Sequence, residues 1–137
     1  MDALDYLNQV RTMSRDLAVK KEKYAALRGM SDTLKTEDDI VEYLDLEVEI
    51  KNDAARLADL KEEIAQLIRK VRKPEYRTLL ELRYLSMWKW EKIAVMMNYS
   101  PKHVYWVHRG ALAAFEKVFQ KGKSSYLPRQ KFVPDRT

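Results

Sequence analysis

Two heptad-like series of apolar residues, separated by a short polar break, constrain the fold more than any other feature of this chain. In the first series the spacing alternates between four and three residues, through Tyr6, Val10, Met13, Leu17, Lys20, Tyr24 and Leu27. The second series alternates in the same way, through Tyr43, Leu46, Ile50, Asp53, Leu57, Leu60, Ile64, Leu67 and Val71. Such spacing is typical of a coiled-coil seam. The sequence therefore predicts two long amphipathic helices, each with one polar residue in its seam.

The break between the two series, residues 29–36, has the residues that end one helix and begin another. Gly29 is a candidate C-terminal cap, and Thr36 with Asp39 three residues later resembles a capping box. Because the connection is short, the two helices are expected to pack antiparallel.

An antiparallel register can be checked, because facing residues must have numbers with a nearly constant sum. Sums of 73 or 74 result from pairing Leu27 with Leu46, Tyr24 with Ile50, Leu17 with Leu57, Met13 with Leu60, Val10 with Ile64 and Tyr6 with Leu67. This register places Lys20 opposite Asp53, so the two polar interruptions neutralise each other in one layer. A polar layer of this kind fixes register more than it adds stability.

The second predicted helix also has apolar residues outside its seam, chiefly Ile40, Leu44 and Val48. A continuous apolar stripe needs a cover, which the C-terminal half, a second copy or a different partner would provide. We expect a homodimer formed through the hairpin. A hairpin that serves only as a spacer is the alternative.

Composition narrows the class of protein. Three Gly and four Pro in 137 residues leave few turns, which argues against an all-β fold. The absence of Cys excludes disulfides, thiol nucleophiles and Cys-ligated zinc, and only two His remain. There is no run of about 18 apolar residues and no signal peptide, so a soluble intracellular protein without a membrane partner is expected. No catalytic residue and no cofactor site is predicted.

Charge and aromatic residues are concentrated at one end of the chain. Residues 71–137 contain fourteen Lys or Arg and five Asp or Glu, a net charge of +9, whereas residues 37–70 have a net charge of −6. Eleven of the fourteen aromatic residues, including all three Trp, follow residue 71. A compact basic half indicates a polyanion as partner, and nucleic acid is the first candidate.

Residues 74–119 have the pattern of a helix-turn-helix module. A first helix is predicted over residues 74–86, with Pro74 in its first turn, and the motif itself follows in residues 90–109. Ala94 is the small residue where two helices meet, and Asn98 tolerates the left-handed conformation of the turn. Ser100 is a good N-cap and Pro101 suits the first helical position. The second motif helix would bury Val104, Val107 and Ala111, with Leu112 and Phe115 below them.

If those apolar residues face the core, the opposite face presents Lys102, Tyr105, Trp106 and Arg109, which we predict to read base edges in a major groove. Candidates for phosphate contacts are Arg83, Lys89, Lys92, Ser100 and His103. Trp106 has the alternative of filling a groove on a protein partner. His103 and His108 are five residues apart without a carboxylate at ligand spacing, so no metal site is expected.

Residues 76–119 resemble the fourth region of sigma-70-type transcription factors. The resemblance rests on Leu82-Arg83-Tyr84, Glu91-Lys92-Ile93-Ala94 and Ala111-Leu112. Up to about residue 119 the chain is similar to small phage and prophage proteins of Gram-positive bacteria, some of which are described as late-gene transcription regulators. The resemblance implies promoter DNA and host RNA polymerase as partners, in the bacterial cytoplasm.

Two departures limit the resemblance. Pro101, Lys102 and His103 stand where sigma factors have the Arg and Glu residues that read the −35 element, so a different DNA sequence is expected. The N-terminal half also lacks an aromatic cluster that could capture unstacked bases, so the chain is not a complete sigma factor.

The sequence thus predicts an all-α protein with an antiparallel coiled-coil hairpin at 1–73, a three-helix helix-turn-helix module at 74–119 and a basic flexible tail at 120–137. The expected function is sequence-specific binding of double-stranded DNA as a phage transcription regulator, without enzymatic activity. The alternatives are a DNA-recognition subunit of a phage packaging machine, similar to small terminases, and a coiled-coil interaction protein.

Overall fold

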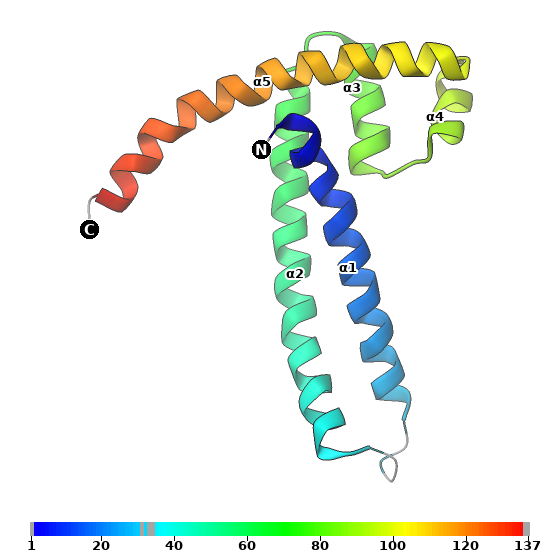
Figure 1. Ribbon diagram of the computed structural model, residues 1–137, viewed down its shortest axis with the longest axis vertical. Helices are drawn as coiled ribbons and strands as arrows, with labels where there is room; N and C mark the ends of the chain where they lie inside the picture. Colours follow the sequence, from blue (N-terminus) through cyan, green and yellow to red (C-terminus); the bar gives the residue numbers. More distant parts are fainter. Residues whose placement is uncertain (1, 31, 33–34, 136–137) are drawn as a thin grey trace. The chain divides into compact units, whose positions relative to one another are not determined.

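The computed structural model describes residues 2–30, 32 and 35–135, with side chains described as far as Gly122. The described residues form α1 (Ala3–Gly29), α2 (Glu37–Arg69), α3 (Pro74–Leu80), the π-helical turn η1 (Glu81–Leu85), α4 (Trp90–Met97) and α5 (Pro101–Asp135) (Figure 1). No strand occurs among them, which confirms the predicted all-α class. None of these helices has both the length and the apolar character needed to span a bilayer, as far as the described residues go.

Local capping signals set several helix ends. The Thr36 N–H donates to Asp39 Oδ2 at 2.9 Å and the Asp39 N–H donates to Thr36 Oγ1 at 3.1 Å, which confirms the predicted capping box at the start of α2. Asp2 caps α1 by accepting from the Asp5 N–H at 2.8 Å. Gly29 is the last residue of α1, but its φ is not positive, so it ends the helix without the left-handed cap that the sequence suggested.

The structure divides the chain into two compact units, and the division differs from the predicted boundary at residue 73. One unit is Gln9–Glu62, here called the hairpin unit. The other joins Met1–Asn8 to Glu63–Thr137 and is here called the helix-turn-helix unit, after the motif that its sequence predicts. The reason is packing at the start of α1. The Tyr6 ring lies 4.8 Å from that of Phe119, and the Ala3 N–H donates to Glu116 Oε1 at 3.1 Å. Glu116 and Phe119 both belong to α5, so the first residues of α1 pack in the same unit as α5.

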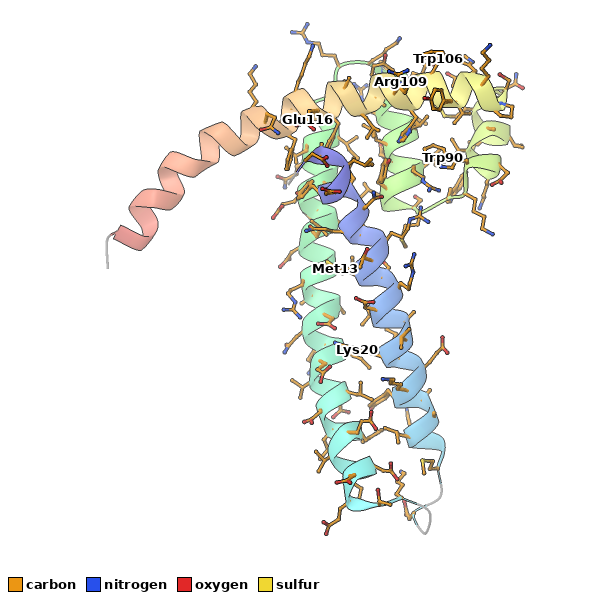
Figure 2. The ribbon with its side chains drawn as sticks, viewed as in Figure 1. Met13, Lys20, Trp90, Trp106, Arg109 and Glu116 are labelled. Atoms are coloured by element: carbon orange, nitrogen blue, oxygen red, sulfur yellow. The ribbon has the colours of Figure 1, made fainter. Side chains whose placement is uncertain are left out.

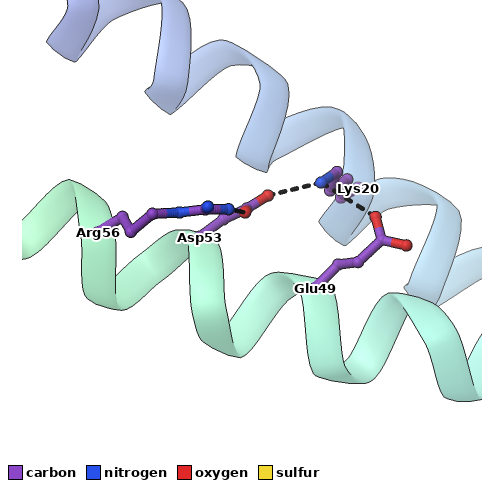
Figure 3. A network of polar contacts seen from close by, with 4 residues as sticks. All are labelled: Lys20, Glu49, Asp53 and Arg56. Atoms are coloured by element: carbon purple, nitrogen blue, oxygen red, sulfur yellow. Dashed lines mark hydrogen bonds and ion pairs between the residues drawn. The ribbon is translucent and has the colours of Figure 1, made fainter.

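In the hairpin unit α1 and α2 run antiparallel (Figure 1), with Leu17, Leu27, Leu46 and Leu57 buried in the seam. The predicted polar layer is confirmed, because Lys20 Nζ lies 2.6 Å from Asp53 Oδ2 (Figure 3). Two further residues of α2 extend the layer. Glu49 Oε1 is 3.0 Å from Lys20 Nζ, and Arg56 Nη2 is 2.5 Å from Asp53 Oδ1. The hydrogen bonds from Lys20 and Arg56 hold the pKa of Asp53 below its ordinary value.

Near the loop end of the hairpin, Tyr24 makes contacts with α2 that the sequence did not predict. Its ring stacks on that of Tyr43 at a centroid distance of 4.6 Å, and its hydroxyl donates to Glu47 Oε2 at 3.0 Å. Hydrogen bonds to Tyr43 and Glu47 raise the pKa of Tyr24 to about 12. The Tyr hydroxyl needs a hydrogen-bond partner, and a register derived from residue numbers alone does not include this requirement.

The segment 74–86, predicted as one helix, consists of α3 and then η1. In η1 the Ser86 N–H bonds to Glu81 O at 2.9 Å, an i→i+5 hydrogen bond, and Met87 follows with a φ of 58°. The wider turn and the left-handed residue reverse the chain before α4. The sequence gives no signal for this, because Met87 is not a residue type that favours positive φ.

The segment 120–137, predicted as a flexible tail, is helical in the structure as far as Asp135. Its backbone continues α5 without interruption from the packed segment 104–119, because extending an existing helix adds one hydrogen bond per residue without a new nucleation cost. Residues 136 and 137 lie outside the described residues.

Candidate nucleic-acid interface

The turn between α4 and α5 has the local features that the sequence predicted. Asn98 has φ 58° and ψ 46°, in the left-handed region, and the Tyr99 N–H bonds back to Ala94 O at 2.9 Å. Ser100 Oγ accepts from the His103 N–H at 3.1 Å, and α5 begins at Pro101. Three residues, 98–100, therefore separate the end of α4 from the start of α5.

Buried residues fix which face of α5 points outward. Val104, Val107, Ala111 and Phe115 are buried, as predicted, together with Ile93 of α4. The first helix of the module contributes Leu79, Leu80 and Tyr84. Since this core occupies one side of α5, the residues on the opposite side, among them Tyr105, Trp106 and Arg109, are exposed.

The four predicted base-reading residues lie on that exposed face. Lys102 and Arg109 are exposed, and Tyr105 and Trp106 keep 57% and 54% of their surface accessible. Figure 2 shows Trp106 and Arg109 on the side of α5 away from α3 and α4. The Arg109 guanidinium lies 5.4 Å from the centre of the Trp106 ring and 5.9 Å from that of Tyr105. Large apolar groups on a helix surface that nothing in the described chain covers are unusual, and here they accompany two cations.

The predicted phosphate-binding residues separate into two groups. Lys89 and Lys92 are exposed at the start of α4, where Lys92 Nζ lies 4.0 Å from the centre of the Trp88 ring. Arg83 is half-buried instead, because its Nη1 donates to Trp88 O at 3.0 Å and its guanidinium lies 4.3 Å from the centre of the Trp90 ring. These contacts tie η1 to the start of α4, so Arg83 has a structural role that the sequence prediction did not include.

The other two predicted phosphate contacts, Ser100 and His103, lie in the first turn of α5. The Ser100 hydroxyl oxygen caps the helix, and the His103 ring packs against that of Tyr99 at 4.0 Å. Both residues remain exposed.

His108 lies beside the core, as the sequence predicted. A hydrogen bond of 2.7 Å joins its Nε2 to the Tyr84 hydroxyl, and the Trp90 ring meets it edge-on at 4.5 Å. Burial, with a smaller contribution from the Arg83 charge, lowers the pKa of His108 to about 4, so the ring is neutral at pH 7. No group of three or more His, Asp or Glu able to hold a metal ion occurs among the described residues.

Two contacts that organise the module were not predicted. An ideal Cβ on Gly110 would lie 2.3 Å from the Tyr76 hydroxyl, so α3 approaches α5 where α5 has no side chain. The Tyr99 hydroxyl also donates to the Glu75 carboxylate, which lowers the pKa of Glu75. The single Gly in the α5 core segment was the only sequence signal for either contact.

Comparison with known proteins places the chain in a family. The family described as Protein of unknown function (DUF1492) matches residues 19–116, which include most of α1 and α2 together and the whole predicted helix-turn-helix motif. The chain belongs to this family. No curated protein and no solved structure matches it. For this DUF1492 protein, a relationship to sigma region four and to phage regulators therefore remains a prediction from the sequence.

Proposed function

We propose that this DUF1492 protein is a sequence-specific double-stranded DNA-binding transcription regulator of phage or prophage origin, which reads promoter DNA with the first half of α5. The observation that supports the proposal is the exposed face of α5, which presents Lys102, Tyr105, Trp106 and Arg109 immediately after a capped left-handed turn. The phage origin, and contact with host RNA polymerase, rest on the sequence resemblance.

The chemistry of this face suits base edges. A major groove about 12 Å wide admits an α-helix, and Lys or Arg side chains bond the O6 and N7 atoms of guanine. Trp106 offers an apolar surface to a thymine methyl, and Tyr105 has both a ring and a hydroxyl. With Lys102 and Arg109 as donors, the four residues combine polar and apolar contacts on one side of one helix.

Positive charge supports the same function. Residues 71–137 have a net charge of +9, with fourteen Lys or Arg against five Asp or Glu. Lys89 and Lys92 are exposed on α4, the helix that precedes the recognition helix in the motif. In such modules the first motif helix crosses the sugar-phosphate backbone, so these two lysines are placed to contact phosphates.

The test begins with selection of a preferred duplex from a random-sequence library by the wild-type protein, followed by anisotropy titrations against that duplex and a scrambled one. Lys89→Ala and Lys92→Ala should weaken binding to both duplexes alike and reduce the slope of log K against log salt by about one each. Lys21→Ala, which removes an exposed cation of the hairpin unit, is the matched control and should change neither affinity nor slope.

Arg109→Ala and Lys102→Ala should act differently, because a base contact contributes about 1–3 kcal/mol of discrimination. Each should reduce the preference for the selected duplex by roughly 5- to 150-fold while non-specific affinity changes less. Tyr105→Ala and Trp106→Ala should behave in the same way. If the wild type enriches no sequence and binds neither duplex at low salt, the DNA-binding function is wrong and the interaction-protein alternative takes its place.

A further inference from the structure

The hairpin unit has an exposed apolar strip bordered by carboxylates, here called the acidic strip. Its centre is Ile40, Val41, Leu44 and Val48, which keep between 48% and 59% of their surface accessible. At these spacings the four side chains lie within about a quarter to a third of the helix circumference. Seven Asp or Glu and no Lys or Arg occur between residues 37 and 50. Among the described residues, Glu37, Asp38, Glu42 and Asp45 have no ion-pair partner.

The helix-turn-helix unit has a groove of the opposite charge between the α2–α3 connection and α5, here called the basic groove. It has a volume of about 870 Å³, within the range of about 300–1,000 Å³ typical of binding pockets. Its apolar wall includes Val71, Tyr76, Ala114 and Val118, and its cations are Lys70, Arg72, Lys73, Lys117 and Lys121.

Most of these cations are not neutralised within the chain. Lys73 Nζ lies 3.5 Å from Glu75 Oε1, whereas Lys70, Arg72, Lys117 and Lys121 have no ion pair with any described residue. Glu116 is the one carboxylate in the groove lining, and its oxygens accept hydrogen bonds from the Ala3 N–H and the Gln120 side chain. The groove therefore combines an apolar wall with a surplus of positive charge.

We propose that the acidic strip of one copy of this chain docks in the basic groove of a second copy, giving a head-to-tail assembly. Each surface supplies what the other lacks, since both are apolar at the centre and their borders have opposite charge.

Charge also excludes the symmetric arrangement through the same surfaces. Strip against strip would bring carboxylates of the two copies together, and groove against groove would do the same for cations. A head-to-tail contact uses different surfaces on the two copies, so it generates a ring if the rotation closes and an open chain if it does not. The inference does not depend on DNA binding.

Sedimentation velocity of nucleic-acid-free, full-length protein tests the proposal with two variants. Lys117→Glu with Lys121→Glu leaves three cations and three carboxylates in the groove lining and leaves the strip intact. Glu37→Lys with Asp45→Lys reverses two charges beside the apolar centre of the strip, because these residues lie on the same side of α2 as Val41 and Leu44, and leaves the groove intact. The wild type should form dimers or larger species as its concentration rises, with assembly weakened by salt, because a two-membered ring is the smallest closed head-to-tail assembly. Each variant alone should lose assembly and sediment as a monomer.

An equimolar mixture of the two variants gives the decisive result. It should regain assembly, because the intact strip of one variant meets the intact groove of the other, and the two altered surfaces also have complementary new charges. Arg15→Glu with Lys21→Glu makes the same charge change at exposed positions of α1 and should assemble like the wild type. Circular dichroism confirms that each variant is folded.

Three results would overturn the proposal. A wild type that stays monomeric at every concentration would exclude assembly. A variant that still dimerises alone would show that other surfaces pair. A mixture that stays monomeric would show that strip and groove do not bind each other.

Discussion

Gly110 shows how one missing side chain determines the packing of a module. It lies in the middle of α5, where helix propensity favours Ala over Gly by about 1 kcal/mol. The Tyr76 hydroxyl occupies the space where a Cβ would be. Packing and propensity therefore act in opposite directions at this position, and their balance can be measured.

Gly110→Ala should lower the free energy of unfolding by about 1–3 kcal/mol, because the cost of overpacking exceeds the gain in helix propensity. Urea titration followed by Trp fluorescence gives the value. Tyr76→Leu in the Gly110→Ala background should recover most of the loss, because the smaller side chain clears the Cβ position. A stabilised Gly110→Ala protein would show that α3 and α5 are not in contact here.

His108 makes the stability of the same module depend on pH. Its folded-state pKa of about 4 is below the ordinary 6.5, so between these values the unfolded chain binds more protons than the folded one. Stability is therefore full above about pH 6.5 and is lost as pH falls towards 4. Because the ring keeps part of its surface in water, the loss should be about 2 kcal/mol.

Urea unfolding between pH 7 and pH 4 measures this loss, and His108→Gln is the control. The variant should be less stable at pH 7, where it lacks the packing of the ring on Trp90, but should have a flatter pH profile. An unchanged profile would assign the pH dependence to carboxylates elsewhere in the chain.

At the scale of the helix, the polar layer of the hairpin is a network of four residues. Lys20 contacts both Asp53 and Glu49, and Asp53 also binds Arg56. A substitution of Asp53 leaves Lys20 paired with Glu49. The loss of stability should therefore be smaller than for an isolated Lys–Asp pair. The network lies in one layer between two helices, so substitutions there test the register directly.

Asp53→Lys should lower the thermal midpoint of the hairpin more than Asp53→Leu does, because it places two ammonium groups in one layer. Lys20→Leu with Asp53→Leu should be tolerated, since an apolar pair of similar size restores a continuous seam. Circular dichroism melting of the four proteins gives the order. Equal midpoints for Asp53→Lys and the double variant would contradict the register.

At the scale of the whole molecule, the first turns of α1 belong to the unit that contains α5. Leu7 is fully buried and Tyr6 is nearly so, whereas Leu4, in the first turn of the same helix, keeps 40% of its surface exposed. All three Trp residues, at positions 88, 90 and 106, lie in this unit, so Trp fluorescence reports its unfolding.

Leu7→Ala should therefore destabilise the transition followed by Trp fluorescence by about 2–5 kcal/mol, although residue 7 is far from any Trp in sequence. Leu4→Ala removes the same side chain from an exposed position and should change stability by about 0.5 kcal/mol or less. If Leu7→Ala left the fluorescence transition unchanged, residues 1–8 would not be part of the helix-turn-helix unit.

The sequence alone determined the features that depend on neighbours along the chain. Heptad spacing predicted α1 and α2, the Thr36–Asp39 pair predicted where α2 begins, and Asn98 with Ser100 predicted the turn before α5. The Lys20–Asp53 layer is a contact between helices, but a regular period in both helices made its register countable. The outward face of α5 followed from the same periodicity.

The tertiary structure decided what depends on residues brought together from distant parts of the chain. It joined residues 1–8 to α5 through Glu116 and Phe119, gave Arg83 a partner in the chain, and left Met87 in a left-handed conformation after η1. No local pattern marks these features, because each side chain has several possible partners and packing selects one of them. For that reason α1, α2 and the turn between α4 and α5 could be predicted from the sequence, whereas η1 and the boundary between the two units could not.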